Sequence, residues 1–488
     1  MVEDFINGLN AIVWSNALIF VALASGLFYS FKTKFVQIRM FKEMIRLLFG
    51  GKSSKRGVSS FQAFAIAISG RVGTGNIAGV ATAIALGGPG AIFWMWVIAF
   101  VGSSSAFIEA TLGQLYKQNK GGEYRGGPAY YIEKGLGIKW FATLFAIATI
   151  FSTAFFLPGV QANSIAAGIK SAFGVDAVYT GMAIIAFLAL IVFGGVKRIG
   201  KFSEIVVPFM AFAYVLLAII IIGMNFREIP MILKLIITSA FGANQAFGGI
   251  VGMAIMWGVK RGIYSNEAGQ GTAPHAAAAA EVSHPAKQGL VQAFSVYIDT
   301  LFVCTATAFM ILFTFQYNVI DPAGGFLFEH IPGVEYGPEY TQLAIESQFP
   351  GFGKIFVAIA LSFFAFTTIM AYYYIAETNV SFLDHKNKRP WMIWALRFLL
   401  LSATFYGTMR SAELAWTMGD IGVGIMAWLN FIAIFLLRKP ALALLKDYER
   451  QKKEGKDPLY DPDESHLDIK NVEIWRRIAT RFKENKNE

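Results

Sequence analysis

The sequence predicts an all-α polytopic membrane protein with 11 transmembrane helices. Of its 488 residues, 55% are hydrophobic and only 15% are charged, whereas roughly a quarter of an ordinary soluble domain is charged. Runs of about 20 apolar residues can cross a ~30 Å hydrocarbon layer as helices, because a helix satisfies its own backbone hydrogen bonds. The sequence contains eleven such runs, which we place at 11–31, 61–86, 90–116, 140–167, 177–196, 203–224, 232–258, 289–316, 353–382, 391–409 and 412–437.

The distribution of Lys and Arg predicts the orientation of these spans, because cytoplasmic loops collect positive charge. Segment 32–56 carries eight basic residues and one acidic residue, so we expect it to be cytoplasmic and the N-terminus to lie outside. With alternating loops, the short inside loops hold 22 basic residues and the outside loops hold 5. An odd number of spans places the C-terminus in the cytoplasm. Topology therefore explains the net charge of +10, and no nucleic-acid partner is expected.

The regions outside the spans have distinct patterns. Residues 35–48 have apolar residues at helical spacing among basic ones, which predicts an interfacial helix on the cytoplasmic leaflet; a solvated linker is the alternative. Loop 317–352 is long enough to cap an extracellular vestibule. Residues 438–488 carry 13 basic and 11 acidic residues and read as a soluble tail, with an amphipathic helix around 469–482.

Two spans are interrupted by glycines and polar residues. The second span contains Ser69-Gly70-Arg71-Val72-Gly73-Thr74-Gly75-Asn76 in its middle. Close helix packing would explain the glycines, but it would not explain Arg71, which costs about 2.5–3.5 kcal/mol at a helix centre in lipid. The seventh span is interrupted in the same way over residues 241–250. Transporters place substrates and ions at such breaks, where freed backbone groups offer partial charges.

The position of the two breaks predicts an inverted repeat. Spans two to six and spans seven to eleven form two groups of five that start on opposite sides, and each group opens with a broken helix. We therefore divide the chain into an N-terminal helix with its interfacial segment, a first repeat, a second inverted repeat and a charged cytoplasmic tail, at 1–60, 61–225, 226–438 and 439–488.

Three motifs resemble the alanine/glycine:cation symporter family, also called the sodium:alanine symporters. They are the stretches that begin Gly73-Thr74-Gly75-Asn76, Gly87-Gly88-Pro89-Gly90 and Arg261-Gly262-Ile263-Tyr264. The resemblance implies a LeuT-type fold of the amino acid-polyamine-cation superfamily in a prokaryotic inner membrane. It also implies sodium-coupled import of alanine or glycine by alternating access. The alternatives are another neutral amino acid, such as glutamine or serine, or coupling to protons.

The resemblance also implies a set of substrate-binding residues. The glycine-rich break would offer backbone amides to the substrate carboxylate, and the second break would contribute a further wall. Thr368 and Tyr372 would close the pocket, although many family members carry Trp where Tyr372 stands. For Gln161 and Asn163, an interhelical hydrogen bond is an equally good reading. The set is Gly73, Thr74, Gly75, Asn76, Gln161, Asn163, Gln245, Gly248, Gly249, Thr368 and Tyr372.

A sodium site follows from the same resemblance. Na+ prefers several uncharged hard oxygens. The expected ligands are three main-chain oxygens and two hydroxyls, those of Ser69, Val72, Phe364, Thr367 and Thr368. The alternative is that both hydroxyls only bond carbonyls of their own helix.

Arg71 departs from the family pattern, in which small or uncharged residues are more usual. It could pair with a buried acid, touch an anionic group of the substrate or fill space near an ion site. Our hypothesis is a structural or gating ion pair, and the candidate partners are Glu109, Asp299, Glu377 and Asp420.

The sequence contains no common motif for metal binding or for enzymatic catalysis. His275 and His284 are nine positions apart, which suits no common zinc-ligand spacing, and no Gly-x-Ser-x-Gly, His-Glu-x-x-His or P-loop occurs. We therefore expect no enzyme and no organic cofactor, and transport driven by an ion gradient. The expected partners are a small neutral amino acid, Na+ and the lipid bilayer; the sequence leaves the oligomeric state open.

Overall fold

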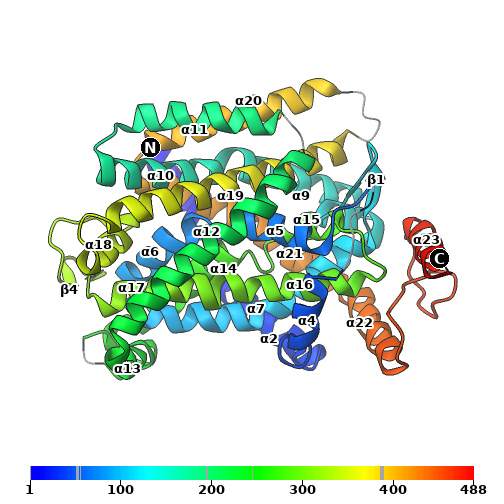
Figure 1. Cartoon of the computed structure of the whole chain (residues 1–488), viewed down its shortest axis with the longest axis horizontal. Helices are drawn as coiled ribbons and strands as arrows, with labels where there is room; N and C mark the ends of the chain where they lie inside the picture. The colour runs from blue at the N-terminus through cyan, green and yellow to red at the C-terminus, as the bar shows by residue number, and fades with distance from the viewer. Residues whose placement is uncertain are drawn as a thin grey trace.

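The computed structural model describes residues 2–50, 54, 56–193, 196–244, 246–384 and 389–487. Most helices run along the long axis of the molecule, and the N- and C-termini lie toward opposite ends of it (Figure 1). The strands form two short antiparallel hairpins, β1(Gln118–Lys120) with β2(Glu123–Arg125) and β3(Asn318–Ile320) with β4(Phe326–Glu329).

Seven helices of the described chain are long and apolar enough to cross a membrane, and they coincide with seven predicted spans. They are Asp4–Lys32, Gly90–Leu115, Lys139–Phe173, Lys201–Met224, Pro285–Phe313, Gly353–Leu383 and Ala412–Leu436. The protein is thus a multi-pass membrane protein of helical class. These long stretches comprise α1(Val2–Val13), α2(Asn16–Lys32), α7(Gly90–Leu115), α9(Lys139–Phe151), η3(Ser152–Phe156), α10(Leu157–Phe173), α12(Val196–Met224), α16(Pro285–Val296), η6(Tyr297–Cys304), α17(Thr305–Phe313), α19(Gly353–Leu383) and α21(Ala412–Leu436).

The other four predicted spans also fall on helices, which are shorter or interrupted. Two of them, α11(Ala177–Val192) and α20(Pro390–Thr408), are continuous. The second predicted span is divided into α5(Ser60–Arg71), η1(Gly75–Gly79) and α6(Val80–Gly87). The seventh is divided into α13(Ile229–Ala240), η5(Gly248–Ile250) and α14(Val251–Asn266).

Large apolar side chains are exposed on the outer helices. Phe187 of α11, Phe209 of α12 and Phe398 of α20 are 64%, 75% and 76% exposed. A water-soluble protein rarely exposes so many large apolar groups side by side. In lipid, however, such side chains meet hydrocarbon at no cost, so these helices form the natural lipid-facing wall.

Helix α7 lies in the core and contacts α14, α16 and α2. Close approach depends on small residues: a Cβ at Gly258 of α14 would lie 2.4 Å from the carbonyl oxygen of Ala91 in α7. Small residues at such positions let membrane helices approach backbone to backbone. The site described below is built on this tightly packed group of helices.

The segment that follows α14 lies between the seventh and eighth predicted spans and is not a simple connecting loop. Glu267 ends α14 in a left-handed conformation with φ of 56°, and Gly269 and Gly271 follow with φ of 81° and 89°. The chain then forms α15(Ala273–Ala279). Every residue from 258 to 286 is buried, so this segment is a second helix break inside the protein and not a solvated loop.

The peripheral elements follow the predictions more closely. The segment 35–48 forms two short helices, Val36–Arg39 and Phe41–Leu48, which are divided at Met40. The cap 317–352 folds into the β3–β4 hairpin and a helix that contact α6. The tail helix begins at Ile474, five residues later than expected. The remaining elements are α3(Val36–Arg39), α4(Phe41–Leu48), α8(Pro128–Tyr131), η2(Ile132–Leu136), η4(Phe226–Glu228), α18(Pro338–Gln348), α22(Arg438–Lys453) and α23(Ile474–Asn487).

Candidate functional site

The first helix break lies between α5 and η1. Helix α5 begins at a capping box, in which the Ser59 hydroxyl accepts from the Gln62 amide and the Gln62 side chain accepts from the Ser59 amide. It ends at Arg71, and Val72 has a non-helical ψ of 90°. The chain resumes as the π-helical turn Gly75–Gly79. Such turns recur at functional sites because they redirect backbone groups.

Gly73 is required at the break because two side chains leave it no room. A Cβ on Gly73 would lie 2.4 Å from the Thr368 hydroxyl oxygen and 2.9 Å from Oε1 of Gln161. The neighbouring amide of Thr74 donates to the same Gln161 oxygen at 3.0 Å. The break is therefore held between α10, which carries Gln161, and α19, which carries Thr368.

The second break meets the first at Gly75. A Cβ there would lie 3.1 Å from Cα of Ser265 and 3.2 Å from Cδ1 of Tyr264, both in the last turn of α14. The unwound residues after α14 are fixed by Glu109 of α7, whose carboxylate accepts from the amides of Gly269 at 3.2 Å and Gly271 at 3.1 Å.

Oxygens gather where α19 crosses the end of α5. The Thr368 hydroxyl lies 2.8 Å from the Ser69 carbonyl oxygen, 3.4 Å from that of Val72 and 3.0 Å from that of Phe364. The Thr367 hydroxyl donates to the Phe364 carbonyl at 2.9 Å. The five oxygens predicted for the sodium site are thus close together. Thr368 bridges two helices, whereas the bond of Thr367 stays within its own helix.

Two buried hydroxyls beside the first break have no hydrogen-bond partner among the described residues. They belong to Thr74 and Tyr264. Tyr372 is also buried and, like Tyr264, interacts with the side chain of Gln161. A buried polar group without a partner costs free energy. These hydroxyls therefore fit a small polar molecule that would bind between the two breaks.

The side chain of Asn76 holds the backbone of the first break in place. Its Oδ1 accepts from the Gly73 amide at 2.9 Å, and its Nδ2 donates to the Asp299 carboxylate at 2.7 Å. Asp299, at the π-helical segment η6, also accepts from Ser265 at 2.9 Å and from Thr300 at 2.7 Å. Asn76 thus shapes the break and joins it to α14 and η6, and its polar atoms are already in use.

Three predicted substrate residues lie elsewhere, and a fourth is outside the described residues. Asn163 donates to the carbonyl oxygens of Gly407 and Arg410 at 3.1 and 2.7 Å, so it ties α10 to the end of α20. Gly249 is exposed and Gly248 partly exposed, in a turn that neighbours Gly242. The reason is that the described residues of this stretch, 241–244 and 246–250, form a peripheral turn and not the second break of the core. Gln245 lies outside the described residues.

Arg71 forms no ion pair with any of the four candidate acids in this structure. Arg71 donates to the Gln292 carbonyl at 3.2 Å and to the Ser295 hydroxyl, both on α16. Among the described residues it has no carboxylate within ion-pair distance, although Glu267, Glu109 and Asp299 act on it electrostatically. Each candidate has other partners: Gly269 and Asn430 for Glu109, Asn76 for Asp299, Arg125 for Glu377, and Lys260 and Arg261 for Asp420.

Sequence reasoning missed the residues of the second break that face the first. Tyr264 and Ser265 contact the glycine-rich turn, and Glu267 accepts from the Thr272 hydroxyl at 2.8 Å. The signal was present, because the family motif contains Gly269 and Gly271 directly after Asn266-Glu267. Those glycines mark positions where the backbone needs a positive φ.

Comparisons with known proteins agree with this architecture. The chain is 62% identical to a Bacillus subtilis protein provisionally named as a sodium/proton-dependent alanine carrier, YrbD, over 98% of both chains. It is 56% identical to the sodium/proton-dependent alanine carrier protein of Bacillus sp. strain PS3, over 91% of this chain and 99% of that one. A manganese transporter of Eremococcus coleocola has a similar fold, with a TM-score of 0.51 at 12% identity, covering 86% of this chain and 92% of the other.

The family match covers nearly the whole chain. Residues 1–462 match the model of the sodium:alanine symporter family. This match includes the glycine-rich break, the second break at 267–272 and the cap, and it ends within the cytoplasmic tail predicted from the sequence. The family consists of transporters and not of enzymes. The chain belongs to the sodium:alanine symporter family.

Proposed function

We propose that the protein is a sodium-coupled symporter that imports a small neutral amino acid, alanine or glycine, by alternating access. The observation that carries this proposal is the meeting of two helix breaks at Gly75. There, the buried Thr74 hydroxyl has no hydrogen-bond partner among the described residues, and Tyr264 of α14 contacts the glycine-rich turn. The names of the similar Bacillus proteins support alanine as the first substrate to test.

The substrate would bind with its carboxylate at the first break. The turn at Gly73, Thr74 and Gly75 supplies backbone amides, and the start of a helix favours negative charge. The amides of Gly73 and Thr74 donate to the neutral side chains of Asn76 and Gln161, whose oxygens an entering carboxylate would replace. The hydroxyl of Thr74 would add a donor at the same place. Gln161, Tyr264 and Tyr372 would form the opposite wall, and these bulky side chains favour a substrate with a small side chain. Asn76 would act through Gly73, because its own polar atoms are occupied.

The transported Na+ would bind where α5 and α19 cross. The carbonyl oxygens of Ser69, Val72 and Phe364 and the hydroxyls of Thr367 and Thr368 form a neutral set of hard oxygens, which suits a monovalent hard cation. Thr368 touches carbonyls of both helices. A cation there would therefore hold the break of α5 against α19 in the same conformation that shapes the substrate position.

Shared conformation is the physical basis of coupling. If Na+ and the amino acid both favour the closed arrangement of α5, α14 and α19, each raises the affinity for the other by the same factor. Neither ligand would shift the equilibrium if it bound all conformations equally.

The topology we propose has eleven spans in a prokaryotic inner membrane. One N-terminal helix precedes two five-helix repeats of inverted orientation, 61–225 and 226–438, in the LeuT manner. The N-terminus lies outside, and the tail 439–488 is cytoplasmic. The break at 267–272 takes the place of 241–250 as the opening break of the second repeat, which preserves the pairing of one broken helix per repeat.

The direct test is uptake of radiolabelled alanine into proteoliposomes under an imposed Na+ gradient. We expect accumulation that stops when K+ replaces Na+, and a pH gradient alone should not drive it. Equal uptake with K+ would contradict sodium coupling. Unlabelled glycine, serine and glutamine, added separately as competitors, identify the substrate range; stronger competition by glutamine than by alanine would contradict the assignment of a small substrate.

A further inference from the structure

The tail helix α23 is fixed against the end of the membrane core. Its Trp475 is fully buried, and the indole nitrogen donates to the Leu115 carbonyl at the end of α7 at 3.0 Å. Ile478 and Ala479, on the same face of α23, are also buried. The tail therefore has a defined docking position beside the β1–β2 hairpin that follows α7.

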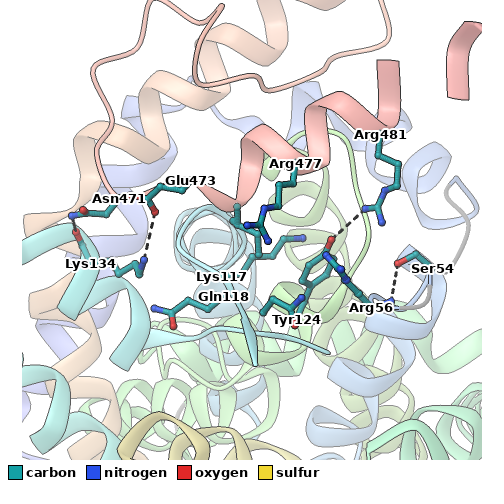
Figure 2. Close-up of a pocket in the computed structure, with 12 residues that line it drawn as sticks. Ser54, Arg56, Lys117, Gln118, Tyr124, Lys134, Asn471, Glu473, Arg477 and Arg481 are labelled. Atoms are coloured by element: carbon teal, nitrogen blue, oxygen red, sulfur yellow. Dashed lines mark hydrogen bonds and ion pairs between the residues drawn. The ribbon is translucent and has the colours of Figure 1, made fainter. Parts of the chain in front are cut away.

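A pocket of about 730 Å³ lies between α23 and this hairpin (Figure 2). Five of its lining side chains are basic and one is acidic. The basic residues come from four separate parts of the chain: the segment before α5, the end of α7, the turn η2 and α23. They are Arg56, Lys117, Lys134, Arg477 and Arg481, and the acidic residue is Glu473.

Part of this positive charge is not neutralised by the protein. Arg481 pairs with Glu281, and Lys134 lies 3.7 Å from Glu473. The side chains of Arg56 and Arg477 have no hydrogen bond or ion pair within the part of the chain that the structure describes. Figure 2 shows Arg477 extending from α23 into the space between α23 and the hairpin.

Lys117 adds a buried amino group to the wall. It is 2% exposed, its nitrogen donates to the Ala280 carbonyl at 2.8 Å, and it lies 4.2 Å from the ring centre of Tyr124. An anion bound in the pocket would favour the protonated, charged form of this amino group.

We propose that this pocket binds a phosphate-bearing anion. Two guanidinium groups without ion pairs, from different elements, can each present a planar pair of donors to phosphate oxygens. Gln118, Asn119 and Asn471 line the same space and add neutral donors. The surplus of positive charge suits a phosphate group better than a single carboxylate.

Two sources can supply this chemistry. The pocket lies at the end of α7, so the headgroup of an anionic phospholipid is one source, and basic pockets beside membrane helices do bind such headgroups. A soluble phosphorylated molecule is the other source. In both cases the anion would join Arg477 of the tail to Arg56, only a few residues before α5 starts, and so connect the tail to the first broken helix.

The test measures hydrogen exchange in residues 471–487 of the full-length protein. One arm adds inorganic pyrophosphate to the detergent-solubilised protein, with NaCl at the same ionic strength as the reference. The other arm compares nanodiscs of phosphatidylcholine with nanodiscs that also contain phosphatidylglycerol. We expect one of these probes to slow exchange about tenfold at a ligand concentration of about ten times Kd, because binding suppresses local opening.

Variants distinguish binding at a specific site from general electrostatic attraction to the protein surface. Arg56→Gln combined with Arg477→Gln should abolish the slowing, whereas Lys446→Gln combined with Lys453→Gln, which removes two exposed charges of α22 outside the pocket, should leave it intact. If the first double variant undocks the tail without any probe, Arg477→Lys keeps the charge and should still weaken the response, because the planar fork is lost.

The outcomes are distinct. Slowing by pyrophosphate assigns a soluble ligand, and slowing only with phosphatidylglycerol assigns a lipid headgroup; both support the site. No slowing with either probe, or equal slowing in the pocket double variant and the wild type, overturns it.

Discussion

Two adjacent threonines of α19 differ in what their hydroxyls contact. Thr367 bonds only the Phe364 carbonyl of its own helix, whereas Thr368 also contacts the carbonyls of Ser69 and Val72 across the first break. Hydroxyls that bond their own helix are ordinary in membrane helices. The contacts of Thr368 between helices therefore identify it as the more important hydroxyl of the proposed sodium site.

We expect Thr368→Val to raise the Na+ concentration for half-maximal uptake by about tenfold or more, since the loss of a hydroxyl ligand of a cation should cost as much as the loss of a hydrogen bond to a charged group, about 1.5–3 kcal/mol. Thr367→Val, which removes the same atom one residue earlier, should change it less. Uptake in proteoliposomes over a range of Na+ concentrations measures both. A larger effect of Thr367→Val would contradict the assignment.

Lys117 lies outside the spans, and the structure strongly alters its pKa. Burial lowers its pKa from 10.5 to about 7, while Glu281 opposes this shift and Arg481 adds to it. Tyr124 and Trp475 face the ammonium group from the hairpin and the tail. Between pH 7 and 10.5 the unfolded chain holds a proton on this lysine that the folded protein has lost. Stability therefore rises with pH across this window.

Lys117→Met should remove this contribution. The difference in stability between wild type and variant should change in favour of the wild type by up to about 1.4 kcal/mol per pH unit as pH rises from about 7. Thermal unfolding of the full-length protein in detergent, measured from pH 7 to pH 10, gives the comparison. Parallel curves for the two proteins would show that the lysine does not titrate in this range.

The two helix breaks show which elements could be predicted from the sequence. The first break was predicted at the correct residues, because Arg71 and Asn76 stand out within an apolar run. The second was placed at 241–250, although it lies at 267–272. Hydropathy cannot distinguish a polar segment in water from one buried among other helices, and irregular backbone is tolerated at membrane depth where protein surrounds it. The glycines of the family motif carried the missing information.

The individual site residues likewise include some whose position could be predicted from the sequence and some whose position could not. Thr368, Gln161 and the glycine-rich turn meet as the family resemblance implied. Asn163 does not lie with them. The spacing of residues in the sequence predicts which face of α10 carries Asn163, but it does not predict which helix packs against that face. Its partners, the carbonyls at the end of α20, lie more than 240 residues away in the chain. Contacts between distant elements decide such roles.

Arg71 acts between elements, because it links the end of α5 to α16 through Gln292 and Ser295. We expect Arg71→Ala to lower the free energy of unfolding by about 1–3 kcal/mol, as buried acceptors lose a donor, and to reduce Na+-driven uptake. Arg71→Lys keeps the charge near Glu267, Glu109 and Asp299 and should recover part of both. Thermal unfolding and proteoliposome uptake are the measurements; full uptake and unchanged unfolding in Arg71→Ala would contradict this role.

At the scale of the whole molecule, the cap and the tail lie at opposite ends of the long axis (Figure 1). The cap consists of the β3–β4 hairpin and α18, and the tail of α22 and α23. The positive charge predicted for cytoplasmic loops lies at the tail end, where Arg56, Lys117 and Lys134 surround α23. One end of the molecule should therefore face the medium and the other the cytoplasm.

Cysteine labelling tests this orientation, because Cys304 is the only cysteine and is buried. In a Cys304→Ala background, Ala323→Cys places a thiol in the exposed turn of the cap, and Lys453→Cys places one at the end of α22. A membrane-impermeant maleimide should label intact cells only at position 323 and permeabilised cells at both. Labelling of position 453 in intact cells would invert the proposed topology.

The bond of Glu109 to the amides of Gly269 and Gly271 has a consequence for stoichiometry. At the second break, the backbone amides already bind a carboxylate of the protein itself. The carboxylate of the proposed substrate would bind backbone amides in the same way at the first break. At the first break the amides of Gly73 and Thr74 donate to the neutral side chains of Asn76 and Gln161, so only there would a carboxylate from outside supply the negative charge. We therefore expect one amino acid per transport cycle, and equilibrium binding of labelled alanine should saturate at one molecule per chain.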